Sequence, residues 1–123
     1  MDADLSGRIS AWRTQDPDPA TVAALDDLAV RADAGDADAL AELESAFAGP
    51  LEFGTAGLRG ALGPGPARMN RVVVGQAAAG LAQYLLDAGH EGGRVIVGYD
   101  ARYNSDVFAR DTAEILAGAG LLP

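Results

Sequence analysis

The sequence predicts an α/β domain preceded by a helical segment, because three hydrophobic patterns follow one another. Apolar residues recur at helical spacing between residues 71 and 87, and again after residue 105. Between these helices, the run Val95-Ile96-Val97 is bounded by an arginine and a glycine, as is typical of a parallel strand buried on both faces. A run this short does not by itself exclude a buried helical segment.

Size and charge narrow the possible classes of protein. The 123 residues suffice for one small domain, and 18 acidic against 9 basic residues give a formal net charge of -9. Nucleic acids and anionic membranes are bound through basic patches, so we expect neither partner. The acidic start lacks the features of a secretory signal, and no apolar run approaches the roughly 18 residues of a membrane span. We therefore expect a cytoplasmic protein.

The residue types present restrict the chemistry that the chain can perform. All nine basic residues are arginines, and there is neither lysine nor cysteine. The single histidine, His90, lies in a glycine-rich stretch that predicts an exposed turn. Without a second histidine or a cysteine, this chain alone builds neither a serine triad nor a zinc site. Arginine and carboxylates must carry any chemistry, and no protein-bound metal is expected from these residues.

Residues 1–50 are expected to form a helical N-terminal extension. Asp18 followed by Pro19 is typical of an N-cap and first helical position, and Gly35 ends that helix before Asp36 caps another. The acidic, proline-rich stretch before the first of these helices could instead be a linker or mimic phosphate; we favour the helix start. The helical spacing is carried by Val22, Leu25, Leu28, Ala29 and Ala32, and then by Leu40, Leu43 and Phe47.

Residues 51–123 are expected to form the α/β domain. The segment Gly63-Pro64-Gly65-Pro66 predicts a constrained loop, because two N–H groups are missing and two residues are conformationally permissive. A helix from Arg71 to Asp87 follows. Its predicted buried face comprises Val74, Ala77, Ala78, Leu81, Leu85 and Ala88.

The last predicted helix begins at a cap provided by Asn104 or Ser105 and ends near Gly118 to Gly120. Its apolar face comprises Phe108, Thr112, Ile115, Leu116 and Ala119. A parallel strand needs a crossover partner, so the topology predicts another strand directly after Gly120. The domain is therefore expected to be incomplete.

The segment Phe53-Gly54-Thr55-Ala56-Gly57-Leu58-Arg59-Gly60 is the strongest candidate for a functional site. Its glycines allow backbone to approach a ligand closely, and Arg59 among them presents a fork of donors matched to phosphate oxygens. The alternative is an ordinary surface arginine in a turn. The glycine frame favours an anion site, with phosphate as the ligand.

Three blocks of the sequence resemble, in order, the signatures of the α-D-phosphohexomutases. They are Gly54-Thr55-Ala56-Gly57-Leu58-Arg59-Gly60, then Gly63-Pro64-Gly65-Pro66-Ala67-Arg68-Met69-Asn70, then Gly98-Tyr99-Asp100-Ala101-Arg102 with Asn104-Ser105. The resemblance extends from Leu51 to about Gly120, and Tyr103 stands where the family often has histidine. It implies a three-layer α/β/α domain I, incomplete here, after a helical N-terminal extension.

The resemblance also implies an activity for the full-length protein. Phosphohexomutases move phosphate between the 1 and 6 positions of a hexose phosphate through a phosphoserine, with Mg²⁺ and a hexose 1,6-bisphosphate activator. The serine loop and the aspartate-rich metal loop of the family do not occur in this sequence. The chain alone is therefore expected to be inactive. Two alternatives stay open, a standalone phosphosugar- or anion-binding module without turnover and an inert truncated product.

The resemblance places Arg59 in the catalytic cleft, near the phosphoserine and the bound sugar phosphate. A guanidinium keeps its proton near neutral pH, so we expect charge stabilisation of the transferring phosphoryl group rather than proton transfer. Gly57 and Thr55 are expected to contact the substrate. The Thr55 hydroxyl has two equal interpretations, donation to phosphate or satisfaction of the local backbone.

Two further pairs of polar residues are expected to support the site from outside. Asp100 and Arg102 follow the predicted strand at the edge where open α/β sheets bind ligands. We expect them to pair with each other and to brace the loop rather than to react. Arg68 and Asn70 could extend the anion site, but a structural contact within the loop is favoured.

Overall fold

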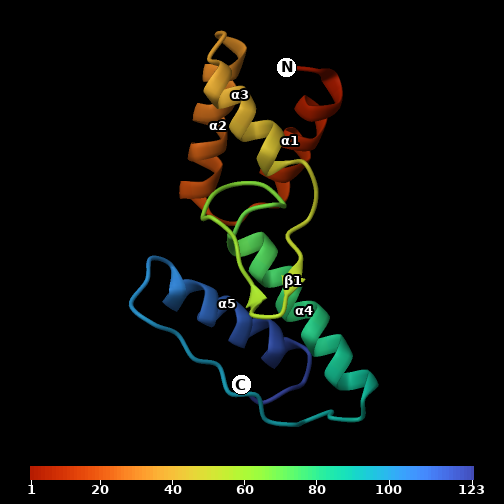
Figure 1. Ribbon diagram of the computed structural model, residues 1–123. Coiled ribbons are helices and arrows are strands. Elements are labelled where there is room, and N and C mark those ends of the chain that lie inside the picture. The colour runs from red at the N-terminus through yellow and green to blue at the C-terminus, as the bar shows by residue number, and fades with distance from the viewer. The chain divides into compact units, whose positions relative to one another are not determined.

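The computed structural model describes residues 1–123 and divides the chain into two compact units, Met1–Val72 and Val73–Pro123 (Figure 1). Both units consist mainly of helices, and two short strands form one small antiparallel sheet. No helix combines the length and the apolar character that crossing a membrane requires.

Three helices make up most of the first unit: α1 (Ala3–Gln15), α2 (Pro19–Asp33) and α3 (Ala37–Ala46). The helices α2 and α3 run side by side, and α1 packs against α2 (Figure 1). At the end of α3, the rings of Trp12 and Phe47 meet edge to face with centroids 6.0 Å apart. The buried side chains are Leu5, Ile9, Trp12, Leu25, Ala32, Ala39, Leu43, Ala46 and Phe47.

Aspartates begin all three helices. The Asp18 carboxylate accepts the Ala20 N–H at 3.0 Å, and Asp36 accepts the N–H groups of Asp38 and Ala39 at 3.0 and 3.2 Å. These contacts satisfy backbone donors that have no partner inside the helix. The predicted starts of α2 and α3 are therefore confirmed. The cap of α1, which the sequence reasoning did not identify, is Asp2, which accepts the Leu5 N–H at 2.7 Å.

The glycine-rich arginine segment forms a short β-hairpin. Strands β1 (Phe53–Gly54) and β2 (Gly57–Leu58) pair antiparallel, so that only Thr55 and Ala56 lie in the turn. Gly57 has a φ of 91°, a left-handed conformation that side chains other than glycine rarely adopt. The local sequence thus fixes a tight turn immediately before Arg59.

The helix α4 (Arg71–Asp87) begins and ends where the sequence predicts. Its buried face only partly agrees, because Ala78 and Ala82 are buried whereas Leu81 is 43% exposed and Ala88 is exposed. Alanine, glycine and valine make up much of this helix. A helix of this composition has no single, well-defined apolar stripe.

The helix α5 (Ser105–Gly118) also lies where it was predicted. Asn104 occupies the N-cap with a φ of 64° but makes no side-chain capping bond. Ser105 does not cap the helix either, because its hydroxyl accepts the Asp100 N–H at 3.0 Å. Both candidate caps thus lie at the predicted boundary without performing the predicted contact.

The predicted strand buried on both faces is wrong for this chain. Residues 95–100 form no regular strand, and Ile96 is 98% exposed, whereas Val95 and Val97 pack against the buried cluster of Ala82, Leu116 and Leu121. A strand requires hydrogen-bonding neighbours along its length, and here only Arg94 has one. It forms a parallel bridge with Leu122, in which Val95 N–H donates to Leu122 O and Leu122 N–H to Gly93 O, both at 2.9 Å.

The residues directly after Gly120, where another strand is predicted, take part in that bridge. Gly120 has a φ of 93° and ends the helical turn, and Leu122 then pairs in parallel with Arg94. The second unit therefore contains the beginning of a parallel β-α-β arrangement, reduced to one bridge.

Candidate functional site

Arg59 follows directly after β2 and lies exposed beside the hairpin turn. Its Nε–H donates to the carbonyl oxygen of Ala56 at 3.1 Å. This single bond turns the guanidinium back toward the turn and engages neither terminal nitrogen. The two terminal nitrogens are the donors that would form a fork onto phosphate oxygens.

Arg59 also differs from most of the other arginines in its electrostatic environment. The arginines paired with a carboxylate are Arg8, Arg13, Arg31, Arg68, Arg102 and Arg110. Neither Arg59 nor Arg94 has such a partner in the structure. In a chain with twice as many acidic as basic residues, an unneutralised arginine on a tight hairpin keeps its charge available for an external anion.

The two other residues predicted to contact substrate lie on the same hairpin. Thr55 is exposed in the turn, and its hydroxyl makes no hydrogen bond with the local backbone. Gly57 is exposed at the start of β2, where a Cβ would meet nothing within 4 Å. Glycine is thus required at this position by its φ of 91° rather than by a neighbouring side chain.

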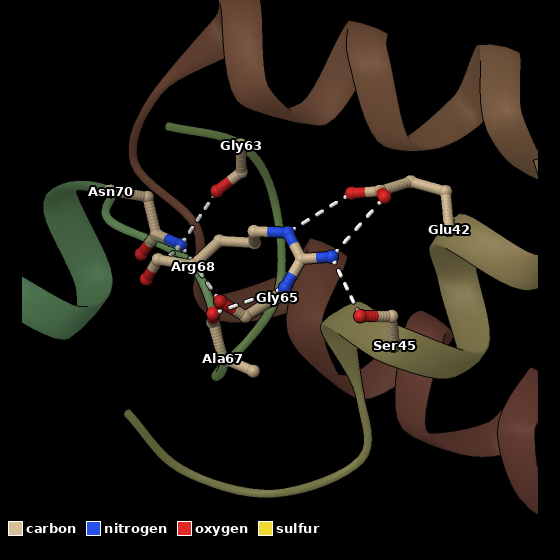
Figure 2. Close-up of polar contacts among 7 residues, drawn as sticks. All are labelled: Glu42, Ser45, Gly63, Gly65, Ala67, Arg68 and Asn70. Atoms are coloured by element: carbon tan, nitrogen blue, oxygen red, sulfur yellow. Dashed lines mark hydrogen bonds and ion pairs between the residues drawn. The ribbon is translucent and has the colours of Figure 1, made fainter. Parts of the chain in front are cut away.

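Arg68 is held by α3 (Figure 2). Its Nε and one terminal nitrogen donate to the two Glu42 carboxylate oxygens at 3.0 and 3.1 Å, and that terminal nitrogen also donates to Ser45 Oγ at 2.9 Å. The Arg68 side chain is only 15% exposed. Its donors are directed to protein groups, as expected for a structural contact.

Asn70 organises the loop from within (Figure 2). Its side-chain nitrogen lies 2.8 Å from the carbonyl oxygens of both Gly63 and Gly65 and 3.3 Å from that of Arg68. Asn70 is 3% exposed and is the one buried polar residue of the chain. Carbonyl groups in an irregular loop need partners, and Asn70 supplies them where no regular secondary structure can.

Asp100 and Arg102 form the ion pair that the sequence predicts, with Arg102 Nε 3.1 Å from Asp100 Oδ2. The Asp100 carboxylate also accepts the Arg102 backbone N–H at 3.0 Å. That backbone bond, followed by the charge of Arg102, holds the pKa of Asp100 below its ordinary value. Both residues belong to the second unit and Arg59 to the first. Their supporting role in a reaction stays a prediction.

Sequence reasoning missed Glu42 and Ser45. They lie 26 and 23 residues before Arg68, on a helix that was predicted only as part of an extension. The signal available was a carboxylate near the end of α3, and nothing local distinguishes Glu42 from Glu44. The structure also places no group of three or more potential metal ligands together, and His90 is exposed as expected.

Comparison with known proteins gives consistent results. The family model described as phosphoglucomutase/phosphomannomutase, alpha/beta/alpha domain I, matches residues 50–122. A probable phosphomannomutase of Haemophilus influenzae is 64% identical over 53 residues, covering 43% of this chain and 11% of the relative. The phosphoribomutase of Saccharomyces cerevisiae is 39% identical over 111 residues, covering 90% and 17%. A phosphoglucomutase of Staphylococcus saprophyticus is 41% identical over 80 residues, covering 65% and 14%.

This chain belongs to the phosphoglucomutase/phosphomannomutase family, within whose α/β/α domain I residues 50–122 fall. It spans between 11% and 17% of the length of these three relatives. No solved structure matches it significantly. The family predicted from the three sequence blocks is thus confirmed.

Proposed function

We propose that this chain is the N-terminal part of a cytoplasmic phosphohexomutase. The complete enzyme transfers phosphate between the 1 and 6 positions of a hexose phosphate through a phosphoserine, and the chain alone has no turnover. Family membership supports the reaction class, and the names of the relatives, which include phosphoglucomutase and phosphoribomutase, support sugar phosphates as substrates. The observation that carries the proposal is that Arg59, uncompensated by any carboxylate, lies directly after a hairpin with a two-residue turn.

Within this proposal Arg59 stabilises charge on the transferring phosphoryl group. Phosphoryl transfer spreads negative charge over equatorial oxygens, so preorganised positive donors lower its barrier. The exposed Thr55 hydroxyl and the glycine backbone at Gly57 would lie against the same phosphate. Asp100 and Arg102 would stabilise their loop, since their side chains already form an ion pair with each other.

We further propose that residues 51–123 contribute to a three-layer α/β/α domain, with residues 1–50 as a helical extension. The segment from Arg94 and the residue Leu122 would be neighbouring parallel strands in its central sheet. The parallel bridge between them supports this arrangement. In that arrangement Ile96, which is 98% exposed in this chain, would be covered by a further layer.

A magnesium ion and a hexose 1,6-bisphosphate activator belong to the proposed full-length reaction. The residues of this chain do not fit a magnesium site, because no three potential ligands lie together. Magnesium usually keeps several waters and is held by one or two carboxylates together with substrate phosphates. The aspartate-rich loop that supplies the carboxylates in the family does not occur in this sequence. The role of this chain toward the phosphate is therefore confined to Arg59 and its hairpin.

The experiment is titration of the chain with glucose 1-phosphate, followed by ³¹P NMR, and glucose added in excess serves as an uncharged competitor that should not displace the phosphate. We expect saturable line broadening that Arg59→Ala abolishes and Arg94→Ala, the matched change at the other uncompensated arginine, leaves intact. Equal broadening with Arg59→Ala would overturn the assignment of the anion site. If the wild type binds but the nucleotide sequence beyond Pro123 encodes no phosphoserine loop, the standalone binding module is favoured instead.

A further inference from the structure

We infer that Glu42, Ser45 and Arg68 form a clamp by which the N-terminal helices position the Arg59 hairpin. The inference rests on the proposed function of Arg59, but the clamp itself is built from contacts of the first unit alone. It assigns to α3 a positioning role in the reaction.

Both ends of the hairpin are attached to one loop, residues 62–70. On the incoming side, Leu51 N–H donates to Pro66 O at 2.9 Å. On the outgoing side, the carbonyl of Ala61, two residues after Arg59, accepts the Met69 N–H at 2.8 Å. A Cβ on Gly60 would lie 2.9 Å from Leu51 Cδ1, so the two ends also pack closely against each other. The direction of the hairpin therefore follows the loop.

The loop in turn is attached to α3. The bidentate Glu42–Arg68 pair and the Arg68–Ser45 bond make one attachment (Figure 2). In addition, the Ala67 N–H donates to the carbonyl oxygen of Ala46 at 3.0 Å. The pair is partly shielded, with side chains 15% and 44% exposed. A bidentate arginine-carboxylate contact fixes orientation as well as distance. It is thus suited to hold an irregular loop in one arrangement.

This clamp differs from the other ion pairs on the same helices. Arg13 and Asp26 also form an ion pair between two elements, α1 and α2, with a closest separation of 2.6 Å, and neither side chain hydrogen-bonds to the loop. An effect on Arg59 is therefore expected from loss of a clamp residue and not from loss of the Arg13–Asp26 pair. Loss of the Arg13–Asp26 pair should weaken helix packing and leave the hairpin in place.

The test combines two measurements on the 123-residue chain. Hydrogen-deuterium exchange of peptides covering residues 51–61 reports the order of the hairpin, and ³¹P NMR titration with inorganic phosphate reports its function. Glu42→Gln should speed hairpin exchange on the order of 10- to 100-fold, the effect expected from losing hydrogen bonds to a charged group. It should weaken phosphate binding on the order of tenfold. Asp26→Asn is the matched control and should change neither.

Two additional variants separate positioning from a general loss of structure. Arg68→Lys keeps the charge and loses the bidentate geometry, so it should fold and still loosen the hairpin. The reversed pair, Glu42→Arg combined with Arg68→Glu, should restore both protection and phosphate binding. If the exchange rate of the hairpin is unchanged in both Glu42→Gln and Arg68→Lys, the clamp does not position the hairpin. The inference also fails if these variants exchange faster but bind phosphate as tightly as the wild type. If the wild type binds no phosphate, the proposed anion site is wrong. The exchange rates still test whether Glu42 and Arg68 hold the hairpin in place.

Discussion

Gly65 lies directly against the end of α3, so that a Cβ on it would be 2.7 Å from the Ala46 carbonyl oxygen and 2.9 Å from the Ala46 Cβ. Its φ of 109° adds a second constraint, because residues with a side chain rarely adopt it. Both constraints come from the attachment of the loop to the helices.

Gly65→Ala should therefore lower the free energy of unfolding of the chain by about 2–5 kcal/mol, from backbone strain and overpacking together. Denaturant unfolding measures this. Gly49→Ala is the control, because Gly49 has open space around its Cβ position and should change stability by less than about 0.5 kcal/mol. Equal, small effects of both substitutions would show that the contact with Ala46 is not maintained in solution.

A second prediction concerns self-association through the segment after Arg94. Ile96 is 98% exposed, Tyr99 69% and Leu122 56%, next to backbone groups without strand partners. Exposed apolar side chains beside an unpaired edge favour association. Sedimentation velocity should detect concentration-dependent oligomers, which Ile96→Lys should reduce. A monodisperse wild-type monomer with a sharp cooperative melt would contradict this expectation.

A third prediction concerns the acid stability of α3. Hydrogen bonds from the Ala39 N–H and then from Arg31 lower the pKa of Asp36 below its ordinary value. A carboxyl whose pKa is lower in the folded state stabilises folding above its unfolded pKa, near 3.9, and loses this contribution as pH falls through the folded value.

The measurement is the Tm of the wild type and of Asp36→Asn as a function of pH. The wild type should be the more stable protein above about pH 5, and the difference should disappear toward about pH 2. Asp33→Asn, at a neighbouring exposed carboxylate, serves as the control. A difference between wild type and Asp36→Asn that is constant across this range would refute the assigned contacts of Asp36.

A fourth prediction is that the purified 123-residue chain does not convert glucose 1-phosphate to glucose 6-phosphate. The family's phosphoserine and metal loops do not occur in its sequence, so the nucleophile is missing. A coupled assay with glucose 6-phosphate dehydrogenase measures the conversion. Turnover proportional to the amount of pure chain would contradict both this prediction and the proposed phosphoserine mechanism.

The features that could be predicted from the sequence are those set by neighbouring residues. Asp18 with Pro19 and Asp36 determine where α2 and α3 begin, because an N-cap acts within one turn of its own position. The glycines around Arg59 also allow a tight turn, but they were interpreted as a ligand-binding frame, and the hairpin itself was not predicted. The strand predicted at residues 95–99 does not form here, because a strand depends on hydrogen-bonding neighbours distant in sequence.

The Glu42–Arg68 clamp was beyond sequence reasoning for a related reason. Its partners are separated by 26 positions, and the pairing depends on how the loop folds back onto α3. Arg68 itself was predicted to make a structural contact within the loop rather than to extend the anion site. Its partner became identifiable only from the structure.

The role of Arg59 in catalysis is measured by substituting it in an enzyme that joins this chain to the remaining domains of a phosphohexomutase. Arg59→Lys keeps the charge but loses the planar fork, so kcat should fall on the order of 10²-fold or more while KM moves less, and Arg59→Ala should be worse. Arg94→Lys, at the other uncompensated arginine, should retain activity. Near-normal kcat in both Arg59 variants, with an unchanged Tm, would show that Arg59 does not stabilise the transferring phosphoryl group.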